Sequence, residues 1–148
     1  MITCIFENGN KASLRHAVVD VLVLKDGKIL LVKRVKQIIE GGKWSIVGGF
    51  VEHDETLLEA AKREVFEETG WEIENLKLLF IQDGPRKNEG NRQSIAFVYT
   101  ADGVIQTGKH DWEEDKIEWF NLSNLPDQSD IAFDHYDHIQ RYLKDQTK

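Results

Sequence analysis

Residues 49–71, GFVEHDETLLEAAKREVFEETGW, hold the strongest structural pattern in the 148-residue chain. We predict a helix over Thr56–Thr69, because Thr56 and Glu59 have the spacing of a capping box and Gly70 is a natural stop. At about 100° per residue, the apolar side chains of this helix share one sector, which we expect to face the core. They are Leu57, Leu58, Ala61 and Val65, with Ala60 at the edge of the sector.

The same helix face becomes acidic toward its C-terminal end. Glu64 and Glu68 fall within or beside the apolar sector, and Glu67 sits at its edge. One interpretation is a solvated face, which is the usual meaning of charges along a helix. The positions argue against it, since carboxylates at this spacing repel one another and lie near the negative end of the helix macrodipole. A divalent cation that prefers oxygen ligands, Mg²⁺ or Mn²⁺, would offset both effects.

Two glycines, Gly48 and Gly49, stand just ahead of the loop that leads into this helix. A plain tight turn is one common use of a Gly-Gly pair. The other is a loop in which the backbone approaches a metal ion or a phosphate without obstruction by side chains. The pair alone leaves both interpretations open.

The whole stretch resembles the signature of the Nudix family of MutT-like hydrolases: Gly, five residues, Glu, seven residues, Arg-Glu, an apolar residue, any residue, Glu-Glu, any residue, Gly and an apolar residue. The matching positions are Gly49, Glu55, Arg63, Glu64, Val65, Glu67, Glu68, Gly70 and Trp71. The resemblance implies an α/β/α sandwich around a mixed sheet, and hydrolysis of a diphosphate linkage. Val47, Asp54 and Trp71 depart from the residues usual in the family, Pro, Gly and an aliphatic side chain, and none of the three removes a ligand.

The resemblance also implies a metal site. Glu64, Glu67 and Glu68 would bind the metal ions, and the carbonyl group of Gly48 would be a further ligand. Metal ions at such a site bridge the diphosphate oxygens, lower the pKa of a bound water and stabilise the leaving phosphate.

Catalysis and scaffolding are assigned to further residues on the same ground. One of the three signature glutamates, or a glutamate from a loop outside the signature, would position or deprotonate the attacking water. Glu113 and Glu114 are the candidates from outside, and the sequence does not choose between them; an exposed acidic loop is the alternative. Glu55 and Arg63 would pair to hold the loop and the helix together.

Apolar runs and turn signals predict the rest of the secondary structure. A strand over Ala17–Leu24 is followed by Asp26-Gly27, a strong hairpin signal, and by a return strand over Ile29–Val32. The other predicted segments are a loop over Arg34–Lys43, a short apolar segment Trp44–Val47, strands over Glu72–Ile81, Ser94–Thr100 and Ile117–Phe120, an exposed loop Asp83–Asn91, a turn Leu122–Pro126 and a helix from about Phe133 to Lys144. This order predicts an α+β or mixed α/β fold with helices packed on a sheet.

Composition places the chain among ordinary globular proteins, with 41% apolar and 30% charged residues, and the length predicts a single domain over residues 1–148. The net charge of −7 disfavours a nucleic acid polymer as partner, whereas a small phosphorylated molecule is compatible with it if metal ions neutralise the site. Cys4 is the only cysteine, which excludes an intrachain disulfide. We find neither a signal-peptide pattern nor a membrane-spanning segment, and therefore expect a soluble, cytoplasmic protein with no membrane partner.

The signature gives the chemistry and not the substrate. Ile131–His135 (IAFDH) resembles a segment of ADP-ribose pyrophosphatase-like Nudix proteins and of their regulator relatives, so ADP-ribose or another nucleotide sugar is the leading hypothesis. The alternative is that this segment only begins the last helix, with Phe133 in the core. A nucleoside triphosphate pyrophosphohydrolase would use the same metal chemistry. A non-catalytic nucleotide sensor is disfavoured, because the carboxylates are complete and 148 residues leave no room for the DNA-binding extension of such relatives. A homodimer is common in this branch of the family.

Candidates for substrate contact outside the signature rest on residue type alone. Three basic residues in or beside the Asp83–Asn91 loop are candidates for phosphate binding, although a solvated loop is the commoner role: Arg86, Lys87 and Arg92. Three aromatic residues are candidates for stacking on a base, with the core as the alternative: Trp44, Tyr99 and, in polar surroundings, Trp112. We interpret His135 and His138 as a polar pair on the surface.

Overall fold

The computed structural model describes residues 2–84, 93–109 and 114–147. Its central hairpin is the predicted one: strand β3 (Ala17–Lys25) and strand β4 (Lys28–Arg34) pair antiparallel on either side of Asp26-Gly27. Both turn residues have positive φ angles, 49° and 73°, as a two-residue turn of type I′ requires. The Asp-Gly pair therefore fixes the register in which Lys25 faces Lys28.

A mixed sheet forms around this hairpin. Its other strands are β5 (Trp44–Ser45), β6 (Val47–Phe50), β7 (Trp71–Gln82), β8 (Ile95–Gln106) and β9 (Glu114–Asn121). The order is β5-β4-β3-β8-β7, with β6 added to β3 and β9 added to β4. The β3–β8 pair is parallel and the remaining pairs are antiparallel, which confirms the predicted mixed sheet.

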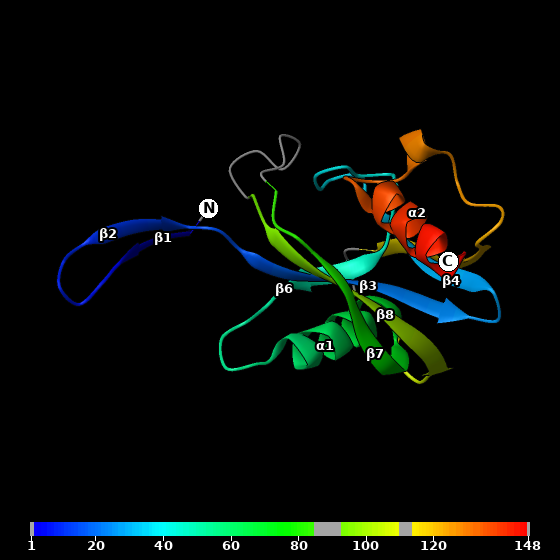
Figure 1. Ribbon diagram of the computed structural model, residues 1–148, viewed down its shortest axis with the longest axis horizontal. Coiled ribbons are helices and arrows are strands. Elements are labelled where there is room, and N and C mark those ends of the chain that lie inside the picture. Colours follow the sequence, from blue (N-terminus) through cyan, green and yellow to red (C-terminus); the bar gives the residue numbers. More distant parts are fainter. Residues whose placement is uncertain (1, 85–92, 110–113, 148) are drawn as a thin grey trace.

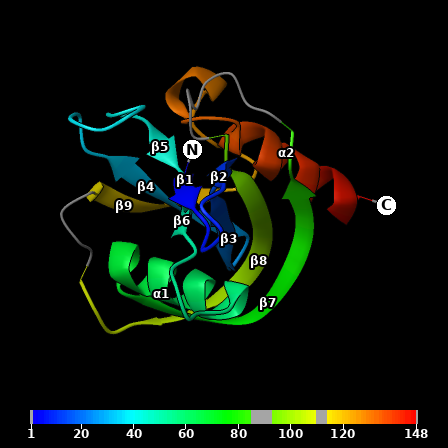
Figure 2. The same cartoon turned by 90° about the vertical axis from the view of Figure 1, so that its left-hand side faces the viewer.

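One helix covers each face of the sheet (Figure 1, Figure 2): α1 (Leu57–Thr69) on one side and α2 (His135–Gln146) on the other. Strand β3 contributes to both layers of core, because neighbouring residues of a strand point to opposite faces. Val19, Val21 and Val23 pack with residues of α1, whereas Leu22 packs with residues of α2. A strand buried on both faces has a continuous apolar run, which is what the sequence shows here. The α/β/α sandwich is confirmed.

Helix α1 begins and ends where the sequence predicts. Thr56 Oγ1 accepts a hydrogen bond from the Glu59 N–H (3.3 Å), and the Glu59 carboxylate accepts one from the Thr56 N–H (2.8 Å). Gly70 closes the helix with a φ of 69°. Leu58 was expected to face the core, and that prediction is wrong: it is 48% exposed, because the buried stripe is narrower and centred on Ala60, Ala61 and Val65. Neither helix of the described chain is long and apolar enough to cross a membrane.

In the C-terminal half, strand β9 begins at Glu114 and not at Ile117, and two further elements differ from the prediction. Strand β8 continues beyond Thr100 to Gln106, because its antiparallel pairing with β7 extends over this stretch. Helix α2 begins at His135 and not at Phe133. Phe133 has a φ of 56°, in the left-handed region, which a right-handed helix cannot include.

A hairpin of β1 (Ile2–Ile5) and β2 (Lys11–Leu14) was not predicted. It forms a separate two-stranded sheet that projects from the body of the molecule (Figure 1). Its strands are too short and too mixed in polarity to give a clear alternation, so the sequence offered little signal. Its large apolar side chains remain exposed: Ile2, Ile5, Phe6 and Leu14.

Candidate active site

One pocket, of about 330 Å³, collects the candidate metal-binding residues together with Gly49 and Arg63. This volume lies in the usual range of small-molecule sites. Strands β3 and β6, helix α1, the 35–43 loop and the segment before α2 all contribute to its walls. The lining residues are Val18, Asp20, Arg34, Ile39, Ile46, Gly48, Gly49, Phe50, Glu52, Arg63, Glu64, Glu67, Glu68, Ser94, Phe133 and His135. The signature carboxylates and the Ile131–His135 segment therefore reach the same cavity.

Arg63 joins α1 to the loop that precedes it. Its Nε and Nη2 donate to the two oxygens of Glu55 at 3.0 and 2.7 Å, and Nη2 also donates to the carbonyl of Phe50 at 3.0 Å. Its Nη1 donates to Glu64 at 2.9 Å and to Glu67 at 3.1 Å. The pairing of Glu55 with Arg63 is thus present, as a two-point contact of planar groups. Through it, the loop is fixed to the helix that carries the acidic residues.

The charges of this pair are stable to changes in pH. The hydrogen bond from Arg63 lowers the pKa of Glu55 to about 2, and the backbone N–H of Glu52 acts in the same direction. The bond to Glu55 is also the first cause that raises the pKa of Arg63 above its ordinary value. Both groups therefore stay charged at every physiological pH, which suits a scaffolding contact better than a proton-transfer step.

The two glycines ahead of the loop lie in strand β6 and not in a tight turn. Gly48 pairs with Asp20, and Gly49 pairs with Val19. A Cβ atom on Gly48 would overlap the carbonyl oxygen of Val19, and one on Gly49 would overlap the carboxylate of Glu64. Close approach of other groups therefore requires glycine here. At Gly49, the approaching group is one of the signature carboxylates.

Glu64 and Glu68 are the buried acidic residues of α1. The Glu64 side chain is 14% exposed, and burial raises its pKa against the opposing effect of the hydrogen bond from Arg63. Glu68 is 8% exposed and accepts a hydrogen bond from the Gly48 N–H at 3.3 Å. Glu67, at 51% exposure, reaches the solvent. The acidic end of α1 is therefore not an ordinary solvated face, since two of its carboxylates are held inside the pocket.

The donor set at this end of the pocket fits a hard divalent cation. Glu64, Glu67 and Glu68 come from adjoining turns of one helix and offer carboxylate oxygens to one cavity. The burial that raises the pKa of Glu64 disfavours its charge, and a bound cation would offset this. Within the described ranges, no three acidic, histidine or cysteine side chains already converge as ligands. Since Arg63 donates to Glu64 and Glu67, these carboxylates would turn from the guanidinium to bind a metal.

The other wall of the pocket forms around Phe133. The preceding residue, Ala132, is fully buried and donates its N–H to the carbonyl of Trp44 at 2.7 Å. The Phe133 ring centroid lies 5.2 Å from the guanidinium carbon of Arg34 and 5.3 Å from the centroid of the His135 ring. Phe133 is only partly buried, so the core interpretation of this residue does not describe it fully. Its ring is part of the pocket surface.

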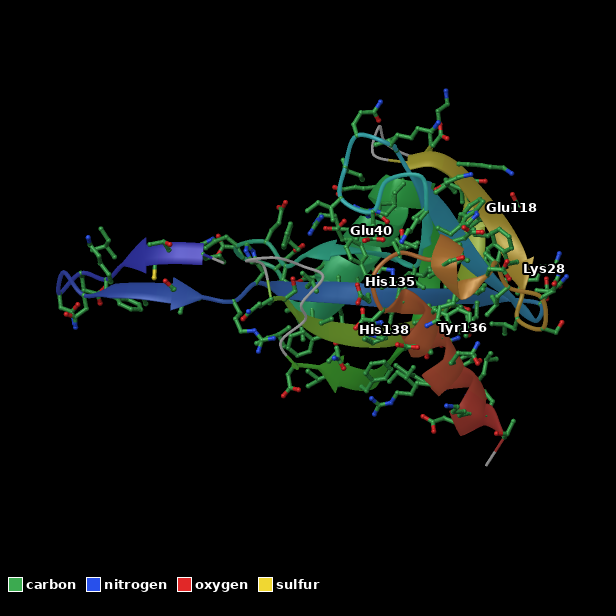
Figure 3. All side chains as sticks on the ribbon, turned by 90° about the horizontal axis from the view of Figure 1, so that it is seen from above. Lys28, Glu40, Glu118, His135, Tyr136 and His138 are labelled. Atoms are coloured by element: carbon green, nitrogen blue, oxygen red, sulfur yellow. The ribbon has the colours of Figure 1, made fainter. Side chains whose placement is uncertain are left out.

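His135 and His138 are buried, at 7% and 3% exposure, where α2 begins over the sheet (Figure 3), so the prediction of a surface pair was wrong. The Ile46 N–H donates to His135 Nδ1 at 3.3 Å, and His135 Nε2 lies 3.9 Å from Asp20 Oδ1. His138 Nδ1 lies 3.7 Å from Asp20 Oδ2, and its Nε2 lies 3.4 Å from Asp134 Oδ2. Their polar neighbours in sequence concealed that both imidazoles face a carboxylate of the central strand.

Sequence reasoning missed three charged pocket residues: Asp20, Arg34 and Glu52. Asp20 carried a usable signal, because an acidic residue inside the run Ala-Val-Val-Asp-Val-Leu must find polar partners when the strand is buried. Arg34 carried none. It stood in the sequence as the first residue of a polar loop, and its place in the pocket depends on how that loop folds back.

Several other candidates lie outside the described residues: Arg86, Lys87, Arg92, Trp112 and Glu113. The backbone of Glu114 belongs to β9, opposite Arg34, and its side chain is likewise outside the description. Two of the aromatic candidates do not line the pocket. Tyr99 belongs to the core beneath α1, and Trp44 packs edge-on against Phe120.

Comparison with known proteins points to one family. The family model described as NUDIX domain matches residues 14–142. An ADP-ribose pyrophosphatase of Methanocaldococcus jannaschii is 39% identical over 127 residues, which cover 85% of this chain and 72% of that protein. The NAD-capped RNA hydrolase NudC of Vibrio atlanticus is 31% identical over 113 residues, which cover 76% of this chain and only 39% of that protein. The crystal structure of a MutT NUDIX hydrolase from Burkholderia pseudomallei has a TM-score of 0.75 at 27% identity, covering 87% of this chain and 98% of that one.

The matched region contains the whole mixed sheet, helix α1 and both walls of the pocket. Its relatives include an enzyme named for the hydrolysis of a nucleoside diphosphate compound, and such enzymes act on small nucleotide substrates. Divalent metal ions are in general use among the hydrolases of this family. The chain belongs to the Nudix family, and it is a Nudix hydrolase of the MutT-like, ADP-ribose pyrophosphatase-like kind.

Proposed function

We propose that the protein hydrolyses the diphosphate linkage of a nucleoside diphosphate-X compound, and that ADP-ribose or a related nucleotide sugar is its substrate. The observation that carries this proposal is the shared pocket, in which Glu64 and Glu68 of α1 meet Phe133 and His135 of the Ile131–His135 segment. The similarity to an ADP-ribose pyrophosphatase over 72% of its length supports the same substrate class.

We further propose that Glu64, Glu67 and Glu68, together with the carbonyl group of Gly48, hold the divalent cation, Mg²⁺ or Mn²⁺. When bound, the cation would polarise the diphosphate and lower the pKa of a water molecule. The helix that carries these ligands is held in place, because the Gly48 N–H donates to Glu68 and Arg63 fixes α1 against the loop.

The proton of the attacking water passes, in this proposal, to one of the signature glutamates Glu64, Glu67 and Glu68, or to Glu113 or Glu114. A general base must lie within hydrogen-bond reach of the water, directly or through a second water. Substitution of each by Gln separates the roles. A ligand variant loses affinity for Mn²⁺ in a titration, whereas a variant of the base keeps that affinity and loses rate.

A second candidate substrate is NAD or a related dinucleotide, supported by the similarity to an NAD-capped RNA hydrolase. Such a compound contains the same diphosphate linkage between two nucleosides, so the chemistry of the site would not change. The chain spans 39% of that relative, and its net charge of −7 disfavours the RNA part of such a substrate.

The deciding experiment is a product analysis with ADP-ribose, other nucleotide sugars, NAD, dinucleoside polyphosphates and nucleoside triphosphates, each with Mg²⁺, with Mn²⁺ and with EDTA. We expect ADP-ribose and water to give AMP and ribose 5-phosphate when a divalent cation is present. Glu68→Gln is expected to be inactive. Glu74→Gln, which changes an exposed glutamate of β7 outside the pocket, is the matched control and should keep full activity.

Two outcomes would contradict the proposal. Release of diphosphate from triphosphates, without cleavage of nucleotide sugars, would establish a pyrophosphohydrolase of the house-cleaning type. Binding of ADP-ribose without cleavage of any compound in the panel would establish a nucleotide sensor.

The homodimer that the family resemblance implies stays a prediction, and its test is the mass of the whole chain in solution. Sedimentation equilibrium should give about twice the chain mass of 17.1 kDa. A single-chain mass at concentrations well above those of the activity assay would contradict it.

A further inference from the structure

The charges that line the pocket are unevenly neutralised. Its acidic side chains come from α1, from β3 and from the loop before α1, while its cationic side chains among the described residues are Arg34 and Arg63. Every nitrogen of the Arg63 guanidinium already donates to a carboxylate of the scaffold, and Nη2 also to the Phe50 carbonyl. Arg34 has no carboxylate partner among the described residues. Within the part of the chain that the structure describes, it is therefore the pocket arginine whose charge is available to an anionic ligand.

Arg34 is held in place by its own loop. It is the last residue of β4, its N–H donates to the Lys43 carbonyl at 3.0 Å, and its carbonyl accepts from the Gly42 N–H at 2.8 Å. The side chain turns back along the loop, where Nε donates to the Ile39 carbonyl at 3.0 Å. This hydrogen bond is made by Nε, the guanidinium nitrogen nearest the backbone. The two terminal nitrogens, Nη1 and Nη2, form a fork that is not used by the described protein groups.

Phe133 is placed beneath this guanidinium by an unusual backbone. A bulky aromatic residue rarely has a φ of 56°, and such a conformation persists only where the surroundings enforce it. Here they do: Ala132 is fixed to Trp44, and the His135 N–H donates to the Ala132 carbonyl at 3.2 Å. The result is a ring that lines the pocket with the guanidinium carbon of Arg34 5.2 Å from its centroid.

We propose that Arg34, stacked on Phe133, binds the phosphate oxygens of the substrate through the fork of its two terminal nitrogens. This rests on the proposed function only in that the substrate carries a diphosphate. The acidic side chains at one end of the pocket suit the divalent cation. At the other end, the guanidinium of Arg34 supplies a positive charge that belongs to the protein. A planar guanidinium matches two oxygens of one phosphate, and the aromatic ring keeps it in one orientation, neither of which a lysine ammonium can reproduce. Sequence reasoning named Arg86, Lys87 and Arg92 for phosphate binding; they lie outside the described residues and stay candidates for further phosphate contacts.

The kinetic test compares Arg34→Gln and Arg34→Lys with the wild type on the best substrate of the panel. A charge-assisted phosphate contact is expected to change affinity about 10- to 100-fold, so the KM of Arg34→Gln should rise by about that factor. Loss of ground-state binding raises KM more than it lowers kcat. Arg34→Lys should recover only part of the loss, because the charge returns without the fork.

The chain offers a matched control. On α2, the guanidinium of Arg141 stacks over the ring of Phe80 at 3.9 Å, outside the pocket. Arg141→Lys removes the same kind of stacked guanidinium and should leave KM and kcat unchanged. If Arg34→Gln behaves like Arg141→Lys, the proposal is overturned.

Phe133 is tested as a positioning residue by Phe133→Leu and by the double variant with Arg34→Lys. If the ring acts through Arg34, Phe133→Leu raises KM in the wild-type background and has little further effect once Arg34 is Lys. Fully additive effects of the two substitutions would overturn the positioning role. Equal midpoints of urea unfolding for all variants show that the comparison concerns binding and not folding.

A binding measurement separates this proposal from the proposed function. The probe is ADP, titrated by calorimetry into the whole protein with Mg²⁺ and with EDTA. We expect the dissociation constant of Arg34→Gln to exceed that of the wild type about 10- to 100-fold in the buffer where ADP binds best. Absence of cleavage of ADP-ribose would end the substrate assignment and leave this result standing. Equal dissociation constants, or no ADP binding by the wild type in either buffer, would overturn the role of Arg34.

Discussion

The two walls of the pocket differ in how their residues come together. At the α1 wall, Glu55, Arg63 and Glu64 lie within ten residues of one another, and hydrogen bonds of Arg63 connect them. The opposite wall combines the end of β4 and the adjoining 35–43 loop with the Ile131–His135 segment, which lies far from them in the chain. The first wall depends on one helix and its loop, whereas the second depends on the packing of the whole sandwich. We therefore expect changes in the first wall to alter stability and rate together, and changes in the second to alter substrate affinity.

Arg63→Ala should have the largest effect. It leaves Glu55, Glu64 and Glu67 without their shared cation and detaches the loop from α1. The free energy of unfolding should fall by about 2 kcal/mol, less than for a fully buried pair, because the Arg63 side chain keeps 24% of its surface exposed. The rate should fall at least about 100-fold, since the carboxylates lose their fixed positions. Urea unfolding and steady-state kinetics measure the two effects.

Arg63→Lys is the informative companion, because it restores the charge without the fork that joins Glu55 to Glu64. We expect it to recover some stability and little rate. Full recovery of the rate in Arg63→Lys would mean that the α1 wall requires only a positive charge at this position. The proposed contrast between the two walls would then be contradicted, because the α1 wall would not depend on fixed geometry.

Glycine-to-alanine changes allow the same substitution at both walls. In Gly49→Ala the new methyl group overlaps the Glu64 carboxylate, and in Gly41→Ala it overlaps the backbone carbonyls of Val35 and Lys36, in the loop that holds Arg34. Gly49→Ala should lower kcat about 100-fold through displacement of a carboxylate that we propose as a metal ligand. Gly41→Ala should act mainly on KM, by moving Arg34. Steady-state kinetics over substrate concentrations from below KM to saturation distinguish the effect on kcat from the effect on KM. A fall in kcat for Gly41→Ala would contradict the assignment of rate to the α1 wall and of substrate affinity to the opposite wall.

The contrast also explains what the sequence could predict. The hairpin at Asp26-Gly27, the capping box and the acidic face of α1 follow from rules that connect residues a few positions apart. The burial of His135 and His138 does not, because it depends on α2 packing over the face of β3 to which Asp20 points. The role of Gly48 and Gly49 was left open for the same reason: whether a glycine turns the chain or admits a neighbour depends on the neighbour.

Glu64→Gln should stabilise the protein while it removes the activity. Burial raises the pKa of Glu64 above its value in the unfolded chain, so the folded state favours the neutral carboxyl group. The contribution of such a group to stability is complete below the unfolded pKa and is lost as the pH rises through the folded pKa. At neutral pH the ionised carboxylate therefore lowers stability, and the uncharged amide of Gln does not.

The measurement is the thermal midpoint in EDTA at several pH values. The Gln variant should unfold a few degrees above the wild type at pH 7, and the two should converge as the pH falls below the ordinary glutamate range. A divalent cation should stabilise the wild type more than the variant, because the variant lacks one of the three proposed carboxylate ligands. A Gln variant that is less stable than the wild type at pH 7 without a cation would show that the bond from Arg63 outweighs the burial of Glu64.

Thr56→Ala should have the smallest effect. Thr56 is the N-cap of α1 and marks the edge of the α1 wall. It removes the hydroxyl that accepts from the Glu59 N–H, and loss of an N-cap side chain costs about 1 kcal/mol. Neither residue lines the pocket, so KM and kcat should not change at temperatures where the protein stays folded. Thr56→Ser, which keeps the hydroxyl, should match the wild type in urea unfolding. If Thr56→Ala also lowers kcat, the start of the helix is coupled to its acidic end, and the α1 wall would then behave as one rigid unit that begins at the cap and not at Arg63.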